Sequence, residues 1–259
     1  MDVNTSTTVV SYETFDKICL TIGRAVKVVP NPSAKVPAYL LQLDMGSALT
    51  EEHFRISNKA YYTSSAQLCS NHAPEDIIDH YILSVINFPR KQIGKMMSDC
   101  LVTGVQMDKG SSEEKRETTV FMTTSTPVDE GSRVGILAKK ERLEKNPRDL
   151  LWPDFTLLDL RIGTIEACES SMEISNNINQ VITRLNLGEL GKQQCIGLLS
   201  KEVDISSLMG KQVLVLTNLS KAAKKELFGR EETGSVLCTI DGLAVLEPAK
   251  PVDNGFKLA

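Results

Sequence analysis

The side chains that most often perform chemistry are few and far apart in this chain of 259 residues. The three histidines (His53, His72 and His80) have no nucleophile motif beside them, and catalysis by histidine needs partners within hydrogen-bond reach. The cysteines show none of the short Cys-x-x-Cys or Cys/His spacings that are typical of zinc and redox sites. We therefore expect no catalytic residue, no metal site and no cofactor, and we expect buried, reduced thiols. The six cysteines are Cys19, Cys69, Cys100, Cys168, Cys195 and Cys238.

Motifs of the common enzyme classes are also missing from the sequence. There is no glycine-rich phosphate loop and no Gly-x-Ser-x-Gly elbow. Adjacent carboxylates such as Glu51-Glu52 and Glu231-Glu232 lie in polar surroundings, which is typical of a solvated surface. The sequence therefore predicts a protein that is not an enzyme.

The clearest chemical feature is a group of cations in the last quarter of the chain. Lys221, Lys224, Lys225 and Arg230 lie within ten residues, and a helix would place Lys221 and Lys225 on one face. Lysine and arginine side chains are the groups that neutralise phosphates in nucleic acids. Two interpretations stay open, phosphate contact and a plain solvated helix, because Glu226 and the following glutamates weaken the patch.

Composition and charge limit the classes of partner. Hydrophobic residues make up 41% of the chain and charged residues 24%, which is ordinary for a globular protein with a real core. The length fits one large domain or two domains of about 100–150 residues. A net charge of −4 and a pI near 5.5 oppose indiscriminate binding of polyanions. With no run of 18 apolar residues and no secretory signal, we expect a cytoplasmic protein with no membrane association.

Two stretches of the chain recur at similar offsets. Residues 15–25 are echoed by residues 155–165, and residues 82–88 are echoed by residues 213–219. Each of the later stretches follows a segment expected to form a helical turn, at 74–78 and at 205–209. We interpret the two halves as divergent copies of one fold. The predicted domains are 1–137 and 154–259, joined by a basic linker at 138–153 that contains the turn signal Asn-Pro.

The repeated units predict short β-strands. Residues 22–29 alternate small or apolar residues with polar ones and are rich in β-branched residues, and residues 39–44 follow after a Pro-rich turn. Gly23 and Gly163 fall inside such runs, where glycine often marks a bulge or a tight bend at a barrel corner. About five strands, one helical turn before the fourth strand and about 100 residues fit an OB-type Greek-key barrel. The predicted fold class is therefore all-β, with two five-stranded OB-fold barrels in tandem and short helical turns.

Several blocks of the sequence resemble the tRNA-binding domain family. The opening pattern Phe-x-x-hydrophobic-x-hydrophobic-x-Ile-Gly and the Asn that ends the fourth strand occur in both halves. That family includes a C-terminal module of some methionyl-tRNA synthetases, aminoacyl-synthetase cofactors, the endothelial-monocyte-activating polypeptide and the bacterial CsaA proteins. Over most of its length the first half is similar to CsaA, in the blocks at 37–40, 64–67, 74–78 and 87–93. The second half is similar to the synthetase-cofactor type, chiefly at 159–163 and 212–219.

Both halves also depart from the family pattern. After the first strand of the second half the family usually has a Pro-Asn-Ala-like turn. This sequence instead has Ser-Ser-Met-Glu-Ile-Ser-Asn-Asn at 170–177. The family's Gly-x-x-Ser segment appears there as Gly-Arg-Glu-Glu at 229–232. The first half keeps Ser98, has Lys95 at the position of the glycine, and carries an insertion at 48–60.

The resemblance implies that RNA binds at the segment just after the fourth strand of each barrel. Cations there would contact phosphates, Asn and Gln would meet base edges, and Ser98 would bond phosphate or sugar. A solvated charged loop beside a core Phe88 is the alternative. The predicted RNA-binding residues are Asn87, Arg90, Lys91, Gln92, Lys95, Ser98, Asn218, Lys221, Lys224, Lys225 and Arg230.

The resemblance further implies a non-catalytic tRNA-binding protein that assists aminoacyl-tRNA synthetases or joins a multi-synthetase complex. Its partners would be tRNA and synthetases. The alternatives are a CsaA-like chaperone or protein-binding module, and a scaffold whose second domain docks a synthetase. CsaA-type domains act as homodimers, so the two halves are expected to form a monomer with a pseudo-dimeric arrangement, or else the chain is a homodimer.

Overall fold

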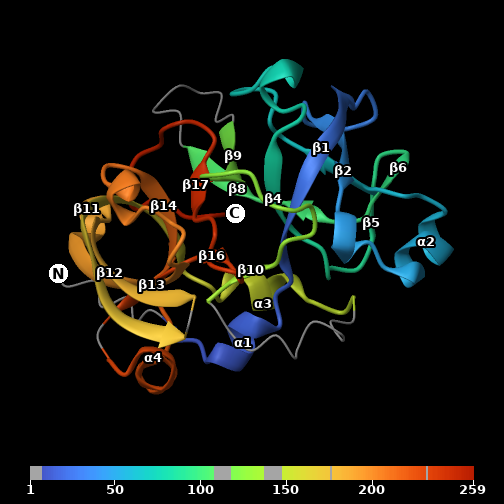
Figure 1. Cartoon of the computed structure of the whole chain (residues 1–259). Coiled ribbons are helices and arrows are strands. Elements are labelled where there is room, and N and C mark those ends of the chain that lie inside the picture. The colour runs from blue at the N-terminus through green and yellow to red at the C-terminus, as the bar shows by residue number, and fades with distance from the viewer. Residues whose placement is uncertain (1–7, 108–117, 137–147, 176, 232) are drawn as a thin grey trace.

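The computed structural model describes residues 8–107, 118–136, 148–175, 177–231 and 233–259, and these form a mostly β structure with short helices (Figure 1). None of the helices in these ranges is long and apolar enough to cross a membrane. All six cysteines are free thiols, and four of them are buried, in agreement with the sequence analysis.

The first half of the chain forms a five-stranded sheet with the order β3-β2-β1-β4-β7. Buried side chains alternate with half-buried ones along β2, so one face of the sheet packs into the core. The two edges of this sheet approach each other, because the Asp99 amide donates to the Thr63 carbonyl oxygen at 2.7 Å. The strands are β1 (Leu20–Pro30), β2 (Tyr39–Asp44), β3 (Tyr62–Ala66), β4 (Tyr81–Val85) and β7 (Leu101–Val102).

The second half forms a closed barrel with the order β11-β12-β13-β15-β14. A parallel pairing of Cys195 with Gly234 and of Ile196 with Ser235 closes the barrel. The strands are β11 (Leu160–Ser175), β12 (Ile178–Asn186), β13 (Lys192–Ser200), β14 (Gln212–Leu216) and β15 (Gly234–Val236).

The same register joins the first and fourth strands of the two sheets. Leu20 pairs with Val85 in the first sheet, and Leu160 pairs with Leu216 in the barrel. All four residues lie within the stretches that recur in the sequence. As expected, a short 3-10 helix precedes each fourth strand, η2 (Pro74–Asp76) and η5 (Ile205–Leu208). The two sheets therefore share strand order and register.

The glycines in the first strands do not sit at bulges, which is one of the two roles that the sequence analysis considered for them. The register shifts lie between Ala25 and Lys27 and between Ile165 and Ala167. Gly23 and Gly163 instead make room for side chains, since a Cβ at Gly23 would be 2.7 Å from the Met45 sulfur. At Gly163 a Cβ would be 2.5 Å from a Leu187 methyl group. A close approach of a neighbouring side chain thus explains both glycines.

Short elements complete the two halves. Helix α4 (Lys221–Phe228) begins at the N-cap Ser220, whose side chain accepts from the Ala223 amide, and ends at Gly229 with φ +68°. The insertion at 48–60 contains helix α2. The remaining helices are α1 (Tyr12–Asp16), α2 (Glu51–Ser57), α3 (Trp152–Thr156), η1 (Gly46–Ala48) and η4 (Gly188–Leu190). The remaining strands are β5 (Lys91–Ile93), β6 (Met96–Ser98), β8 (Gly104–Met107), β9 (Thr118–Thr124), β10 (Val134–Gly135), β16 (Cys238–Thr239) and β17 (Leu246–Pro248).

Strands of the two halves pair with each other. Strand β10 of the first half pairs with β16 of the second, and Leu258 of the second half bridges to Val105 of the first. At the centre, β9 pairs with β17 in antiparallel register, with Thr123 opposite Glu247 (Figure 1). Gly131 and Gly255, with φ values of +89° and +87°, follow these two residues at the same distance along the chain. The two glycines therefore lie at matching distances after the paired residues Thr123 and Glu247.

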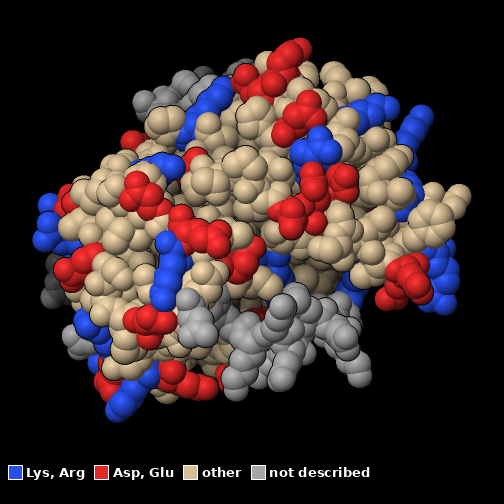
Figure 2. All heavy atoms as spheres, viewed as in Figure 1, with Lys and Arg blue, Asp and Glu red and all other residues tan. Residues whose placement is uncertain are grey.

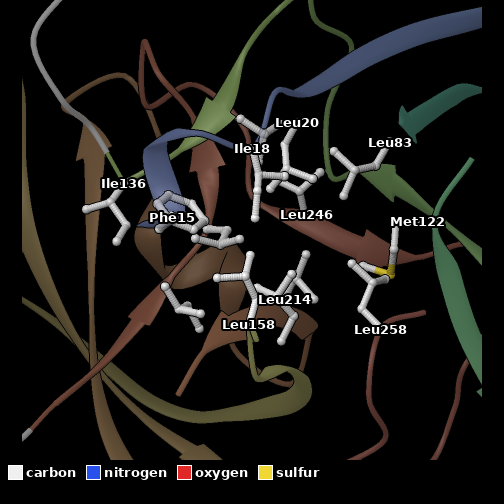
Figure 3. Packing of buried hydrophobic residues seen from close by; sticks show 14 of the residues in the cluster. Phe15, Ile18, Leu20, Leu83, Met122, Ile136, Leu158, Leu214, Leu246 and Leu258 are labelled. Atoms are coloured by element: carbon white, nitrogen blue, oxygen red, sulfur yellow. The ribbon is translucent and has the colours of Figure 1, made fainter. Parts of the chain in front are cut away.

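The largest hydrophobic cluster draws on both halves. Figure 3 shows Phe15, Ile18 and Leu20 of the first half facing Leu158 and Leu214 of the second, and all five are buried. Burial of apolar surface at this junction stabilises the halves against each other.

The predicted linker at 138–153 is structured at its C-terminal end. Leu150 is buried, and its amide donates to the Asn87 carbonyl oxygen at 3.3 Å. Residues 138–147 lie outside the described residues. Residues 108–117 also lie outside them, while the strands on either side, β8 and β9, pair in antiparallel register.

Candidate nucleic-acid interface

Each fourth strand ends at an asparagine whose side chain is buried. The Asn87 Oδ1 accepts from the Cys19 amide at 2.9 Å, and its Nδ2 donates to the Lys17 carbonyl oxygen at 2.7 Å. The Asn218 carboxamide makes the same pair of bonds, with the Asp159 amide and the Leu157 carbonyl oxygen, at 2.9 and 2.8 Å. Both carboxamides therefore lock the start of the following segment in place instead of facing solvent.

In the first half this segment is the β5–β6 hairpin. Arg90 lies at its base, where its Nε donates to the Asp99 carboxylate at 2.7 Å. The Asp99 side chain is completely buried, and its other oxygen accepts from the Thr63 amide at 3.0 Å. Lys59 approaches the same carboxylate at 3.8 Å. Arg90 thus closes the hairpin onto the sheet, and this ion pair occupies the guanidinium that the sequence suggested for phosphate contact.

The other predicted residues of the hairpin divide into exposed and buried groups. Lys91, Gln92 and Lys95 are exposed on the hairpin surface. Gln92 donates to the Gly94 carbonyl oxygen at 3.2 Å, and the Lys95 amide donates to the Ser33 hydroxyl at 3.3 Å. Ser98 is buried and its hydroxyl donates to the Cys100 carbonyl oxygen at 3.0 Å. Two lysines, Lys91 and Lys95, therefore present the accessible positive charge of this hairpin.

A second arginine reaches the base of the same hairpin. Arg148, from the end of the predicted linker, donates to the Asp99 carbonyl oxygen at 2.9 Å and lies 5.0 Å from the centre of the Tyr62 ring. His53 stacks on the same tyrosine, with 4.0 Å between the two ring centres. Burial lowers the pKa of His53. No local pattern signals this cluster, because Arg148 and His53 are 95 residues apart.

In the second half the corresponding segment is helix α4, as expected for the lysines that it carries. Lys221 and Lys225 are exposed, one turn apart, and Lys224 is half-buried. Lys225 pairs with Glu231 at 3.3 Å, and both side chains remain largely exposed. Arg230, just beyond the helix, is also exposed. The helix is anchored to the barrel by Gln180, which donates to the Phe228 carbonyl oxygen at 3.1 Å.

The two segments are separate surfaces. Helix α4 and the β5–β6 hairpin lie on opposite sides of the molecule in Figure 1. Basic and acidic residues are interspersed over the face shown in Figure 2. Among the described residues, no group of three or more His, Cys, Asp or Glu side chains is arranged to hold a metal ion. The arrangement suits two small patches of exposed lysine on rigid supports.

The sequence of this chain is similar to segments of aminoacyl-tRNA synthetases. No protein-family model matches the chain. The chain is 36% identical over 112 residues to the methionine–tRNA ligase of Methanococcoides burtonii, and 30% identical over 118 residues to that of Methanoregula boonei. The matches cover 42% and 46% of this chain but only 16% and 17% of the ligases. The chain thus spans less than a fifth of the length of these curated relatives.

Two solved structures are similar to parts of this chain. The CsaA chaperone protein of Picrophilus torridus is 27% identical, with 48% of this chain and 97% of CsaA covered and a TM-score of 0.36. The C-terminal domain of Plasmodium vivax p43 is 14% identical, with 70% and 92% covered and a TM-score of 0.42. The expected resemblance to methionyl-tRNA synthetases is confirmed as sequence similarity, and the chain is homologous to a short segment of methionine–tRNA ligases.

Proposed function

We propose that this protein is a non-catalytic tRNA-binding protein built from two OB-type barrels, which assists aminoacyl-tRNA synthetases. One observation carries the proposal: in each half, a buried asparagine at the end of the fourth strand fixes a segment that exposes two lysines. Homology to a segment of methionine–tRNA ligases supports tRNA as the ligand. An OB barrel binds nucleic acid through a positive groove that follows the backbone.

The charge distribution sets the kind of binding we propose. Exposed Lys91 and Lys95 would meet phosphates in the first half, and Lys221 and Lys225 would do so in the second. Arg90 and the two asparagines would act by positioning these segments. With a net charge of −4, the long-range attraction for RNA is small, so binding would be modest and strongly reduced by salt.

A salt series of binding to bulk tRNA tests the proposal. Lys91→Ala/Lys95→Ala and Lys221→Ala/Lys225→Ala each remove two exposed cations from one segment. Because each lost phosphate contact lowers the salt slope by about one unit, the contributing segment is identified by a slope that falls by up to about two. No tRNA binding by the wild type at about 50–100 mM salt would refute the proposal.

A matched control removes two lysines elsewhere. Lys211 pairs with Glu247, and Lys250 pairs with Asp76. Lys211 and Asp76 precede the fourth strands, whereas the two lysine segments follow them. The Lys211→Ala/Lys250→Ala variant changes the net charge by the same amount. An equal loss of slope in this control would mean that net charge, and not the two segments, governs binding.

A second candidate function is protein binding, as in the CsaA-like alternative. Helix α2 exposes Phe54 and Ile56, with 53% and 52% of each side chain accessible. Two large apolar side chains exposed on this seven-residue helix are the observation that favours this function. Suppression of the aggregation of an unfolded client protein by the wild type, and its loss in Phe54→Ser/Ile56→Ser with tRNA binding intact, would favour this function.

We also propose that the two halves form an intramolecular pseudo-dimer and that the chain is a monomer. The strand pairs between the halves and the shared hydrophobic core support this, because each half already packs against the other half within one chain. Light scattering should give a mass near 28.5 kDa. A stable mass of twice this value would contradict the proposal.

A further inference from the structure

An open cavity of about 550 Å³ lies where the two halves meet. Its wall is formed by η2 and the residues on either side of it, by the start of β4, by the end of β9 and the residues after it, and by β17 with the residues that follow it. Cavities of this size hold small molecules. The residues used below are His72, Glu75, Asp76, Asp79, Thr124 and Glu247, all of which line it.

The most unusual member of this wall is His72. Its side chain is only 3% exposed, yet neither ring nitrogen has a hydrogen-bond partner among the described residues. Buried polar groups are almost always hydrogen-bonded, because an unpaired one costs about 1–3 kcal/mol. The ring is held in place by Phe121, with 4.7 Å between the ring centres. A fixed imidazole without a hydrogen-bond partner, in the wall of a cavity, is a group that a ligand entering this wall would pair with.

Thr124 supplies a second unpaired group in the same wall. Its residue is 8% exposed, and its hydroxyl also has no partner among the described residues. Thr124 is the last residue of β9, which pairs with β17 of the other half. A hydroxyl and an imidazole can each accept a hydrogen bond from an ammonium group. The two unpaired groups come from different parts of the first half and meet in one cavity.

The charged groups of the wall are mostly carboxylates. Glu75, Asp76, Asp79 and Glu247 line the cavity, and Lys250 is the one lysine or arginine among the lining residues. Lys250 is engaged by the Asp76 carboxylate at 3.0 Å and by the Asn71 carbonyl oxygen at 2.6 Å. Arg24 pairs with Asp79 at 3.2 Å, and Lys211 lies 3.9 Å from Glu247. Among the described residues Glu75 is thus the one lining carboxylate without an ion pair, and this single unbalanced charge favours a cation over an anion.

The protonation state of His72 agrees with a cationic ligand. Burial, followed by the charge of Lys250, lowers the pKa of His72 to about 4. The imidazole is therefore neutral near pH 7 and keeps a nitrogen lone pair that accepts a hydrogen bond.

The matching register of the two sheets provides an internal comparison. The alignment that matches Val85 with Leu216 places Val203 at the position of His72 and Lys211 at that of His80. In the second half the unpaired imidazole is thus replaced by an apolar side chain. The position of His80 carries a cation, which lies 3.9 Å from Glu247. Folding of this motif therefore does not require a histidine at the position of His72.

From these observations we propose that the cavity between the two halves binds a small organic cation of the diamine or polyamine class, through the His72 imidazole, the Thr124 hydroxyl and the carboxylates of the wall. The site is separate from the lysine segments and does not depend on RNA binding. Its negative wall and its unpaired acceptors together select an ammonium group.

Calorimetric titration of the RNA-free full chain with putrescine tests this assignment. We expect one saturable site, at least tenfold weaker binding in Glu75→Gln and in His72→Val, and no saturable binding of the uncharged isostere 1,4-butanediol; tenfold corresponds to about 1.4 kcal/mol. Glu75 is exposed, so Glu75→Gln keeps the test valid even if His72→Val unfolds. His72→Val introduces the residue that the second half already has.

Glu189→Gln is the matched control, since it removes one exposed carboxylate that does not line the cavity. Its affinity for putrescine should equal that of the wild type. Equal weakening in Glu189→Gln and Glu75→Gln would reveal mere attraction to an acidic protein and would overturn the site. The site is also overturned if putrescine gives no saturable binding up to about 10 mM, which corresponds to a binding free energy smaller in magnitude than about 3 kcal/mol. Two uncharged compounds, 1,4-butanediol and adenosine, test the charge of the ligand. If either binds as tightly as putrescine, the cationic class of ligand is overturned.

Discussion

Asn87 and Asn218 occupy equivalent positions and make the same two backbone hydrogen bonds in the two halves of the molecule. Asn218 makes a third bond, because its Nδ2 also donates to the Thr8 carbonyl oxygen at 2.7 Å. Thr8 belongs to the N-terminal segment of the first half, whose Val10 bridges to Leu219. Asn218 therefore ties a barrel strand, its own half and the opposite half together.

Replacement of this carboxamide should destabilise the fold. Asn218→Ala leaves one backbone amide and two carbonyl groups without their partner, so we expect a loss of about 2–4 kcal/mol in the free energy of unfolding. Urea denaturation of the full chain measures this loss. The control Asn177→Ala removes the side chain of an exposed asparagine and should change stability by less than about 0.5 kcal/mol. Equal midpoints for the two variants would contradict the anchoring role of Asn218.

The hairpin cations should separate into a structural arginine and two surface lysines. Arg90→Ala removes a 2.7 Å ion pair from the fully buried Asp99 carboxylate, so we expect it to cost about 1–3 kcal/mol of stability. Lys91→Ala/Lys95→Ala should leave stability unchanged within about 0.5 kcal/mol, because both side chains are exposed. Thermal unfolding of the two variants makes the comparison. A stable Arg90→Ala protein would return Arg90 to the group of candidate phosphate ligands.

Much of the framework could be predicted from local patterns. The apolar runs around Ile22 and Leu83 recur around Ile162 and Leu214, and the strands that they form pair in the same register. Such strands can be predicted from the sequence, because the alternation of residue types and the turn residues that end a strand lie within a few residues of each other.

Contacts between distant residues could not be predicted in the same way. Arg90 looked like a phosphate ligand because its partner Asp99 is brought to it only by the β5–β6 hairpin. The cavity wall joins His72 to Thr124 and Glu247, which meet through the pairing of β9 with β17. A sequence read without tertiary contacts shows neither the neutralised charge nor the unpaired imidazole.

Gly131 should tolerate no side chain. Its φ of +89° is a left-handed conformation, and a Cβ there would lie 2.5 Å from the Met45 carbonyl oxygen. We expect Gly131→Ala to cost more than about 2 kcal/mol, measured by urea denaturation. Gly197 is the control, because its Cβ would be 3.5 Å from the Val236 Cβ, an ordinary contact. Gly197→Ala should cost about 1 kcal/mol or less, and equal losses would contradict this explanation.

Acid should destabilise the protein through His72. Its pKa falls from 6.5 in the unfolded chain to about 4 in the folded state, because burial and the charge of Lys250 oppose protonation, while the Asp76 carboxylate partly favours it and the neighbouring His80 opposes it. The unfolded chain therefore binds the proton first, so the contribution of His72 is complete above pH 6.5 and is lost as the pH falls from 6.5 toward 4.

The size of this loss follows from the pKa shift. Between pH 6.5 and 5 it amounts to about 2 kcal/mol, at about 1.4 kcal/mol per pH unit. Urea denaturation at pH 7 and pH 5 measures the loss in the wild type and in His72→Val. The lowered pKa of His53 acts in the same direction in both proteins, so the difference between them isolates His72. Stability that falls equally in both proteins would show that His72 is not held neutral, and the acceptor proposed for a cationic ligand would lose its basis.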